Sequence, residues 1–337
     1  MMPDGDNNSL IEVRDLEVRF EGRRGEAPVR AVNGVSFALP AGECVGLVGE
    51  SGCGKSTLAN ALMGLVPYQA GEIRVEGQAL PSRLSDGRGA YARFVQMVFQ
   101  DPLGALNPRM RIGPAIAEVL RVHRLANNNA EAAAMVPRLL DRVGLASRLA
   151  SRYPHEISGG QRQRVCIARA LAVEPSVLIA DEPVSALDVS VQVQILNLLK
   201  ELQQDLGLTI LFISHDLATV QYMCESVLVM YLGHVVERGP VSALFGAPAH
   251  PYTESLLSAV PDVTRVGASS GGRSSRILLK GEPPSPREHP SGCTFHPRCP
   301  RAQPQCACDV PVETVLANSQ RSQCHFAEQA ATWAASR

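Results

Sequence analysis

Gly49-Glu50-Ser51-Gly52-Cys53-Gly54-Lys55-Ser56-Thr57 is the stretch of this sequence that decides its fold. It has the pattern G-x-x-x-x-G-K-[ST] and follows an apolar run at residues 44–48, which predicts a loop between a strand and a helix. Glycines let backbone N–H groups approach phosphate oxygens closely, and the helix adds the positive end of its dipole. Lys55 supplies a charge for β- and γ-phosphates, and Ser56 supplies a hydroxyl for Mg²⁺. The stretch therefore predicts a phosphate-binding loop in an α/β fold.

Chance is the alternative explanation for this pattern. From average glycine usage we expect roughly one match per hundred random chains of this length. The apolar strand before the loop and the Ala- and Leu-rich segment at residues 58–65 make chance a weaker explanation. We therefore predict that the chain binds a nucleotide.

Composition narrows the function classes. The chain has 337 residues and a net charge of −1, which argues against a broad basic surface for nucleic acid. It holds no run of about 18 apolar residues that could span a membrane. Residues 1–9 are polar and acidic, unlike a secretion signal. We expect a cytosolic protein whose role at a membrane, if any, depends on a partner.

The order of predicted elements indicates an α/β domain that is interrupted by a helical insertion. Strands are predicted at residues 10–20, 32–39, 44–48, 72–75, 94–99, 177–180, 209–213 and 227–236. Residues 105–173 change to a helical pattern and predict an inserted helical subdomain. The helix between the strands at 177–180 and 209–213 predicts a right-handed parallel crossover. We place a nucleotide-binding domain at 8–262, a Gly/Ser-rich linker at 263–276 and a cysteine-containing extension at 277–337.

Two carboxylates end the apolar strand at residues 177–180. Asp181 is placed to reach Mg²⁺ through a water, and Glu182 to polarise an attacking water. A strand that ends in a solvated acidic turn is the ordinary explanation for such a pair. In a chain with a phosphate-binding loop, the catalytic interpretation is favoured.

A second anion-binding pattern lies at residues 153–161. Ser158, Gly159 and Gly160 stand before Gln161 and an apolar helix, which predicts a helix N-terminus suited to an anion. A chain with one phosphate-binding loop does not need a second segment that binds the same γ-phosphate. The pattern is explained if it caps the nucleotide of another subunit. Arg162 and Arg164 follow it, and we expect them on a solvated helix face.

Together these motifs resemble the ATP-binding subunits of ABC transporters over roughly residues 10–260. The loop matches the Walker A motif, residues 157–161 match the family signature with Ile157 in place of the usual Leu, and Asp181 and Glu182 match Walker B. Residues 185–188 match the D-loop, which ends in Asp188. The resemblance implies a P-loop ATPase core with an antiparallel β subdomain and an inserted helical subdomain.

Three further positions take their roles from the same resemblance. Gln100 matches the Q-loop glutamine, which implies a contact with Mg²⁺ beside Ser56 and Asp181. His215 matches the switch histidine at the γ-phosphate, and it joins Gln100 and Glu182 as a catalytic group. Phe20 lies where the family places an aromatic residue on adenine, although an ordinary strand residue explains it equally well.

A narrower resemblance is to importers of dipeptides, oligopeptides or nickel. It rests on residues 99–109, 181–190, 250–253 and 291–300. It implies ATP hydrolysis that drives import of short peptides or a related solute. The implied partners are a second ATPase subunit, identical or homologous, two transmembrane permease subunits and, indirectly, an extracytoplasmic solute-binding protein. The resemblance also implies that the chain lies at the cytoplasmic face of the membrane. An exporter ATPase and a soluble ATPase of translation or DNA repair are the alternatives.

Nine cysteines are many for a cytosolic chain. Cys44, Cys53, Cys166 and Cys224 are scattered, and we expect small buried side chains or incidental thiols there. The C-terminal region holds Cys293, Cys299, Cys306, Cys308 and Cys324. Their spacing leaves zinc, an iron–sulfur cluster or no metal open, and crowding in a reducing compartment favours metal over disulfides. The resemblance favours a [4Fe–4S] cluster on Cys293, Cys299, Cys306 and Cys324, with Cys308 or His325 as substitute ligands.

Overall fold

The computed structural model describes residues 9–22, 26–82, 88–259, 277, 279, 281–282 and 284–330. The predicted linker at 263–276 lies outside these residues, as do residues 331–337 of the predicted extension. Among the described residues, none of the helices combines the length and apolar character that crossing a membrane requires.

An eight-stranded sheet forms the centre of the molecule, in the order β11-β12-β10-β9-β3-β8-β7-β6. The first three strands are β11 (Thr314–Val315), β12 (Arg321–Ser322) and β10 (His234–Pro240). Five neighbouring strands run parallel: β9 (Ser226–Tyr231), β3 (Cys44–Val48), β8 (Thr209–Ile213), β7 (Val177–Asp181) and β6 (Val95–Val98). Helix α7 (Val189–Leu206) connects β7 to β8, so the predicted parallel crossover is confirmed. The phosphate-binding loop leaves the carboxyl end of β3, in the middle of this sheet.

Both faces of the parallel strands are covered. Leu178 and Phe212 pack into one hydrophobic core, and their chain neighbours Ile179 and Leu211 pack into another. Successive side chains of a strand point to opposite faces, so a strand buried on both faces has a continuous apolar sequence. This is why the run at residues 177–180 predicts its strand correctly.

A second, antiparallel sheet lies across one of these faces. Its order is β2-β1-β4-β5, and the strands are β1 (Ser9–Phe20), β2 (Val29–Pro40), β4 (Ala70–Val75) and β5 (Gln78–Leu80). Helix α1 (Lys55–Leu62) packs between the two sheets through Leu58 and Leu62, and α2 (Arg88–Phe94) lies beside it through Tyr91. The predicted antiparallel subdomain is therefore present.

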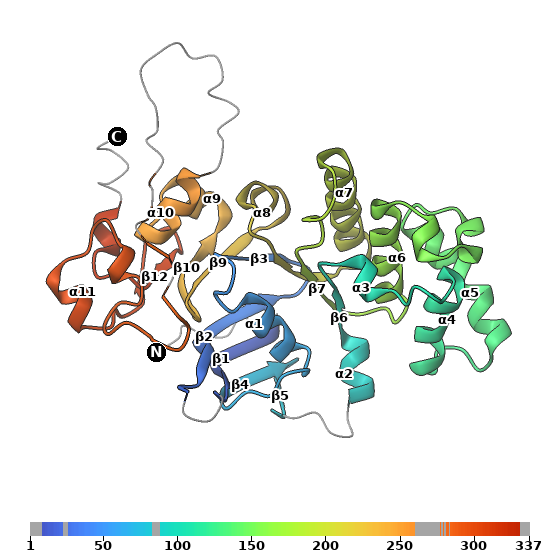
Figure 1. Ribbon diagram of the computed structural model, residues 1–337, viewed down its shortest axis with the longest axis horizontal. Coiled ribbons are helices and arrows are strands. Elements are labelled where there is room, and N and C mark those ends of the chain that lie inside the picture. Colours follow the sequence, from blue (N-terminus) through green and yellow to red (C-terminus); the bar gives the residue numbers. More distant parts are fainter. Residues whose placement is uncertain are drawn as a thin grey trace, which may run out of the picture.

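The helical insertion stands at one end of the molecule (Figure 1). It contains α3 (Pro102–Ala105), α4 (Ile112–Val122), α5 (Asn129–Arg142), two short 3₁₀ turns at Ser147–Ser151 and Pro154–Glu156, and α6 (Gly159–Leu171). Ile116, Leu120 and Leu140 are fully buried between its helices. The change to a helical pattern in this part of the sequence thus predicts the subdomain.

The C-terminal region closes the opposite end in Figure 1. It follows α8 (Leu217–Met223), α9 (Val241–Gly246) and α10 (Pro251–Ser258), and contains a 3₁₀ turn at His296–Arg298, α11 (Pro304–Cys308) and a last turn at Ala327–Gln329. Strands β12 (Arg321–Ser322) and β11 (Thr314–Val315) extend the main sheet beyond β10 (His234–Pro240). Phe295 is fully buried in the main core. The extension therefore shares a sheet and a core with the α/β domain.

Candidate functional site

The loop between β3 and α1 has the backbone that its glycines predict. Gly49 has φ 153° and Gly54 has φ 111°, a region that residues with a Cβ rarely adopt. A Cβ on Gly49 would lie 2.1 Å from the Met230 carbonyl oxygen, and one on Gly54 would lie 2.1 Å from the Ala31 carbonyl oxygen. The loop can pass this close to its neighbours only with glycine at these two positions.

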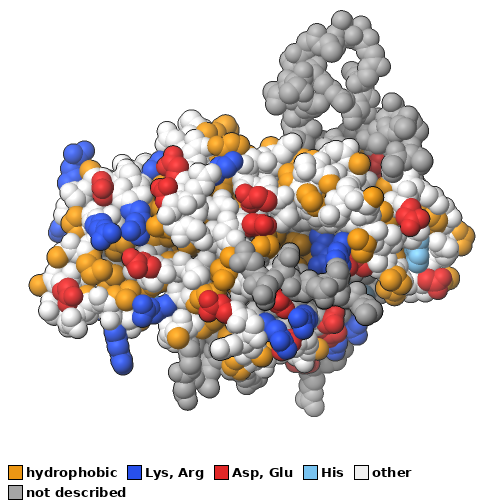
Figure 2. All heavy atoms as spheres, turned by 180° about the vertical axis from the view of Figure 1, so that it is seen from behind, with side chains coloured by type: hydrophobic (Ala, Val, Ile, Leu, Met, Phe, Trp, Pro, Cys, Tyr) orange, Lys and Arg blue, Asp and Glu red, His pale blue; other side chains and the backbone are white. Residues whose placement is uncertain are grey.

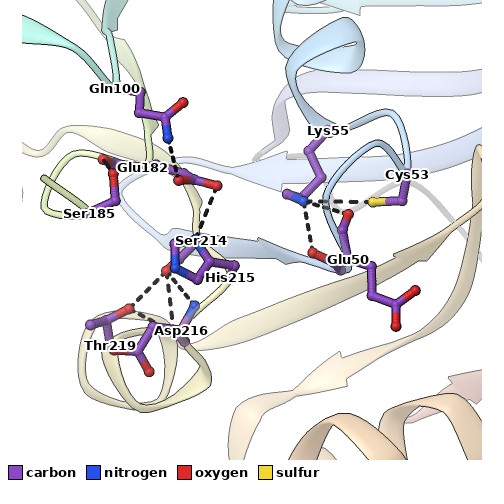
Figure 3. Close-up of polar contacts among 11 residues, drawn as sticks. Glu50, Cys53, Lys55, Gln100, Glu182, Ser185, Ser214, His215, Asp216 and Thr219 are labelled. Atoms are coloured by element: carbon purple, nitrogen blue, oxygen red, sulfur yellow. Dashed lines mark hydrogen bonds and ion pairs between the residues drawn. The ribbon is translucent and has the colours of Figure 1, made fainter. Parts of the chain in front are cut away.

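Lys55 begins helix α1 and turns its side chain back over the loop. Its Nζ donates to the carbonyl oxygen of Gly49 at 2.8 Å and to that of Glu50 at 3.0 Å (Figure 3). The side chain is buried. The ammonium is thus held inside the loop, next to the N-terminus of α1, and the two positive features favour an anion at the same place.

Asp181 ends β7 close to the same loop. Burial raises the pKa of its carboxyl group, the nearby Glu182 raises it further, and the Ser56 hydroxyl and Lys55 oppose the shift. A buried carboxylate beside a hydroxyl is a suitable pair of oxygen ligands for a hard divalent cation. The structure therefore brings Ser56 and Asp181 together, as their predicted role at Mg²⁺ requires.

Two of the predicted catalytic side chains contact the carboxylate of Glu182. The Gln100 amide donates to one carboxylate oxygen at 2.7 Å, and Nδ1 of His215 lies 3.2 Å from the other (Figure 3). The backbone of Glu182 has φ 45°, and its N–H donates to the Ile213 carbonyl at the end of β8. A left-handed conformation at a residue other than glycine costs energy and is common at functional sites.

The turn that presents His215 is fixed by its neighbours. The Ser214 hydroxyl lies 3.1 Å from the Thr219 hydroxyl and accepts a hydrogen bond from the Asp216 N–H at 3.0 Å. The Asp216 carboxylate accepts a hydrogen bond from the Ala218 N–H, and Asp216 thereby caps the N-terminus of helix α8. His215 itself is exposed at the tip of this turn, on the side of Glu182.

The second anion-binding pattern forms a capped helix. The Ser158 hydroxyl accepts from the Gln161 N–H, and the Gln161 side chain accepts from the Ser158 N–H at 3.1 Å. A Cβ on Gly160 would lie 2.4 Å from a methyl group of Val191, so this glycine also allows α6 to approach α7. Figure 1 shows α6 apart from α1, in the helical subdomain. Within one chain, the two predicted anion-binding segments therefore lie apart (Figure 1).

The remaining predicted site residues lie at the ends of elements. Asp188 precedes α7 without a capping hydrogen bond from its side chain. Phe20 is the last residue of β1 and is 41% exposed. Both side chains are exposed and can contact a ligand or a partner.

The prediction of a solvated face for Arg162 and Arg164 was wrong. Arg162 donates to the carbonyl of Ile157 at 2.7 Å, and Arg164 donates to that of Val143 at 2.7 Å. Both side chains are partly buried. They satisfy carbonyl groups of the preceding segments, which have no helical partner of their own.

The four predicted ligand cysteines face one small pocket. Cys293, Cys299, Cys306 and Cys324 all line it, together with His250, His296 and His325, whereas Cys308 is exposed and does not. Burial raises the pKa of Cys299 to about 11 and that of Cys324 to about 12, and the neighbouring cysteines add to both shifts. Nowhere in the described part of the chain do three or more His, Cys, Asp or Glu side chains form a group arranged to hold a metal ion.

Two contacts of the loop were missed by sequence reasoning. Tyr252 accepts a hydrogen bond from the Glu50 N–H, and Arg298 forms an ion pair with the Glu50 carboxylate. Both residues lie in stretches that resemble the importer branch, and that was their only signal. Their partner is more than 200 residues away in the sequence.

Known proteins resemble this chain along most of its length. Residues 32–185 match the model of the ABC transporter family, and residues 236–306 match the C-terminal region of oligopeptide/dipeptide transporters. The chain is 48% identical to the oligopeptide transport ATP-binding protein OppF of Escherichia coli, over 90% of this chain and 92% of that protein. It is 45% identical to the di/tripeptide transport ATP-binding protein DppF of Pseudomonas aeruginosa, over 95% of this chain and 98% of that protein.

This chain belongs to the ABC transporter family. Solved structures of ABC proteins have a fold similar to that of this chain. A dimeric ATP-binding cassette in a post-hydrolysis state with ADP and Pi is 28% identical, with a TM-score of 0.61, over 68% of this chain and 98% of that chain. CbiO1 of Clostridium perfringens, part of an ABC transporter complex, is 29% identical, with a TM-score of 0.62, over 71% of this chain and 91% of that chain. The predicted fold class and the family resemblance are both confirmed.

Proposed function

We propose that this chain is the ATP-hydrolysing subunit of an ABC importer for di- or oligopeptides. The observation that carries the proposal is the meeting of Gln100 and His215 on the carboxylate of Glu182. It occurs in a chain whose C-terminal region matches that of oligopeptide/dipeptide transporters. Relatives named for oligopeptide and di/tripeptide transport favour peptides over nickel or export.

The chemistry follows from the positions of the side chains. Lys55 and the N–H groups of the loop bind the β- and γ-phosphates of ATP, which is the substrate. Ser56, Asp181 and Gln100 would hold Mg²⁺, which neutralises charge on the phosphate oxygens. Glu182 accepts a proton from the attacking water, and Gln100 and His215 fix the orientation of its carboxylate.

A second ATPase subunit, identical or homologous, completes each site. Ser158, Gly159, Gly160 and Gln161 cap the nucleotide bound to the partner subunit, and Asp188 lies at the same interface. The position of α6, apart from α1 of its own chain, supports this arrangement (Figure 1). So does the similarity to a dimeric cassette that was solved with ADP and Pi. Phe20 stacks on the adenine ring, for which its exposed position at the end of β1 is suitable.

The chain works at the cytoplasmic face of the membrane, on two permease subunits supplied with solute by an extracytoplasmic binding protein. The segment after Gln100 is suited to contact the permease, because Phe99 and Leu103 are exposed apolar residues beside it. We expect no nucleic-acid partner for a chain with a net charge of −1. Basic and acidic side chains are interspersed over the face in Figure 2.

We also propose that the C-terminal cysteines hold a metal centre, a [4Fe–4S] cluster, with zinc as the alternative. The donor set fits, because the four thiols of Cys293, Cys299, Cys306 and Cys324 line one pocket. Cys306 and not Cys308 is the third ligand, since only Cys306 reaches this pocket. A bound cation would favour the thiolates, which burial disfavours, and would draw the four sulfurs together. It would hold this short, proline-rich segment in one shape.

Reconstitution tests the proposed function. The chain, its partner ATPase subunit and the permease subunits are inserted into liposomes, and ATP hydrolysis and uptake of a labelled tripeptide are measured with the binding protein outside. We expect uptake that requires ATP and stops with Glu182→Gln in both subunits. Hydrolysis that never responds to any peptide, with no peptide uptake, would contradict the assignment of the solute.

A further inference from the structure

An ion pair links the C-terminal region directly to the phosphate-binding loop. The Arg298 guanidinium donates to both carboxylate oxygens of Glu50, at 2.7 and 3.1 Å. The Arg298 side chain is only 7% exposed. In Figure 3 the Glu50 carboxylate points away from the Lys55 ammonium, so it faces out of the loop.

Both backbone polar groups of Glu50 form hydrogen bonds. Its N–H donates to the Tyr252 hydroxyl at 2.8 Å, and its carbonyl oxygen accepts from Lys55 Nζ at 3.0 Å. One residue thus connects the C-terminal region to the lysine that binds phosphate. A shift of Glu50 would move a carbonyl group that holds the Lys55 ammonium.

Arg298 is itself fixed by packing. Phe295, three residues earlier, is fully buried, and its ring contacts those of Tyr231 and Tyr252 at centroid distances of 5.2 and 5.3 Å. The Arg298 N–H donates to the Phe295 carbonyl at 3.0 Å. The guanidinium group lies 5.9 Å from the centre of the Tyr231 ring. The arginine therefore presents a preorganised fork to Glu50, which lysine could not reproduce.

We propose that Arg298 is a positioning residue for ATP binding, which acts through Glu50 on the phosphate-binding loop and Lys55. The proposal rests on the proposed ATPase function and extends it, because it gives the C-terminal region a role in the affinity for nucleotide. Removing one member of this half-buried, two-pronged pair leaves the other charge without its partner, so the loop would relax away from its binding conformation.

The experiment compares Arg298→Ala, Arg298→Lys and Glu50→Gln in the assembled transporter. The Michaelis constant for ATP, kcat, and equilibrium binding of Mg·ATP are measured, with thermal unfolding as a record of folding. We expect Arg298→Ala to raise the Michaelis constant and the dissociation constant roughly tenfold, which corresponds to about 1.4 kcal/mol, while kcat changes less than about threefold. Glu50→Gln should have the same effect, and Arg298→Lys a smaller one.

Two further variants separate positioning from general packing. Arg301→Ala removes a neighbouring arginine whose partner is Glu254 on α10, and it should leave the affinity for ATP within about twofold of the unmodified transporter. The exchange Arg298→Glu with Glu50→Arg should recover part of the affinity that Glu50→Arg alone loses.

Each result decides the proposal. Unchanged affinity in both Arg298→Ala and Glu50→Gln overturns it, as does an equal loss in Arg301→Ala. If Arg298→Ala does not fold, Glu50→Gln and Arg298→Lys decide. If the unmodified transporter hydrolyses no ATP, the proposed function fails instead, and Mg·ATP binding still tests the role of Arg298.

Discussion

The side chain of Gln100 donates a hydrogen bond of 2.7 Å to the carboxylate of Glu182, from 82 positions earlier in the sequence. His215 reaches the other oxygen of the same carboxylate. Glu182 is therefore held between two loops that leave different strands of the main sheet. Movement of either loop would reorient the group that is proposed to activate water, which gives a partner at the Gln100 segment a route to the site.

Replacement of Lys55 by Ala removes the ammonium held in the phosphate-binding loop. We expect ATP hydrolysis by the assembled transporter to fall by more than about a hundredfold, as for other losses of preorganised charge at a reacting group. Steady-state ATPase assays measure this. Lys200→Ala is the control, because Lys200 lies on α7 and contacts Tyr222. Near-normal hydrolysis by Lys55→Ala would show that this loop does not bind the phosphates.

Replacement of Glu182 by Gln keeps the shape of the side chain and removes the base. ATP should still bind, and turnover should fall roughly a hundredfold or more. Retention of radiolabelled ATP on the purified complex, with little Pi released, is the expected result. The exposed Glu201→Gln on α7 should behave like the unmodified protein. Rapid turnover by Glu182→Gln would assign the base to another group.

Ser158 should act on the partner's nucleotide. With Ser158→Arg in one subunit and Lys55→Ala in the other, the head-to-tail arrangement puts both changes in one site and leaves the second intact. With both changes in the same subunit, both sites are damaged. Counting trapped ATP in a Glu182→Gln background should give about one per pair in the first case and close to none in the second. Ser147→Arg, on the exposed turn of the same subdomain, is the control. The reverse result would exclude this arrangement.

The C-terminal cysteines should bind metal in protein purified without oxygen. A [4Fe–4S] cluster predicts about four irons per chain and a brown colour, and a structural site predicts about one zinc. Cys299→Ser should lose the metal, whereas Cys308→Ser should keep it, because Cys308 lies outside the shared pocket. Metal analysis and absorption spectra measure both. Protein without iron or zinc would mean that packing alone orders the segment.

His234 should make folding stability depend on pH. Burial, reinforced by His289, lowers the pKa of His234 to about 4, and Asn33 donates to its Nε2. Between about pH 6.5 and 4 the unfolded chain binds a proton that the folded chain does not. Stability from this group is therefore complete above that range and is lost as the pH falls, by up to about 1.4 kcal/mol per unit.

Urea unfolding at several pH values between 7 and 5 tests this prediction. His234→Gln should lose stability less steeply than the unmodified protein, since glutamine does not titrate. His155→Gln, at an exposed position, should keep the original slope. Equal slopes for all three proteins would show that His234 is not the group responsible.

Most of the site could be predicted from the sequence because its parts are short and contiguous. The loop at residues 49–57 needs glycine where φ is positive, and the strands beside it are largely apolar because both of their faces are buried. Ser158 and Gln161 stand at the spacing of a capping box, which the structure contains. Such patterns act through neighbouring residues, so they can be recognised without knowledge of the fold.

The contacts between distant residues could not be predicted in this way. Arg298 meets Glu50 only because β10, β12 and the buried Phe295 bring the C-terminal region against the loop. Cys44 and Cys224, expected as scattered thiols, lie with their sulfurs 3.4 Å apart for a similar reason. The sequence by itself determined the family, the ATP-binding loop and the elements around it. The tertiary structure decided which side chains from separate elements share a site, because the packing of strands and helices sets those distances and no local pattern encodes them.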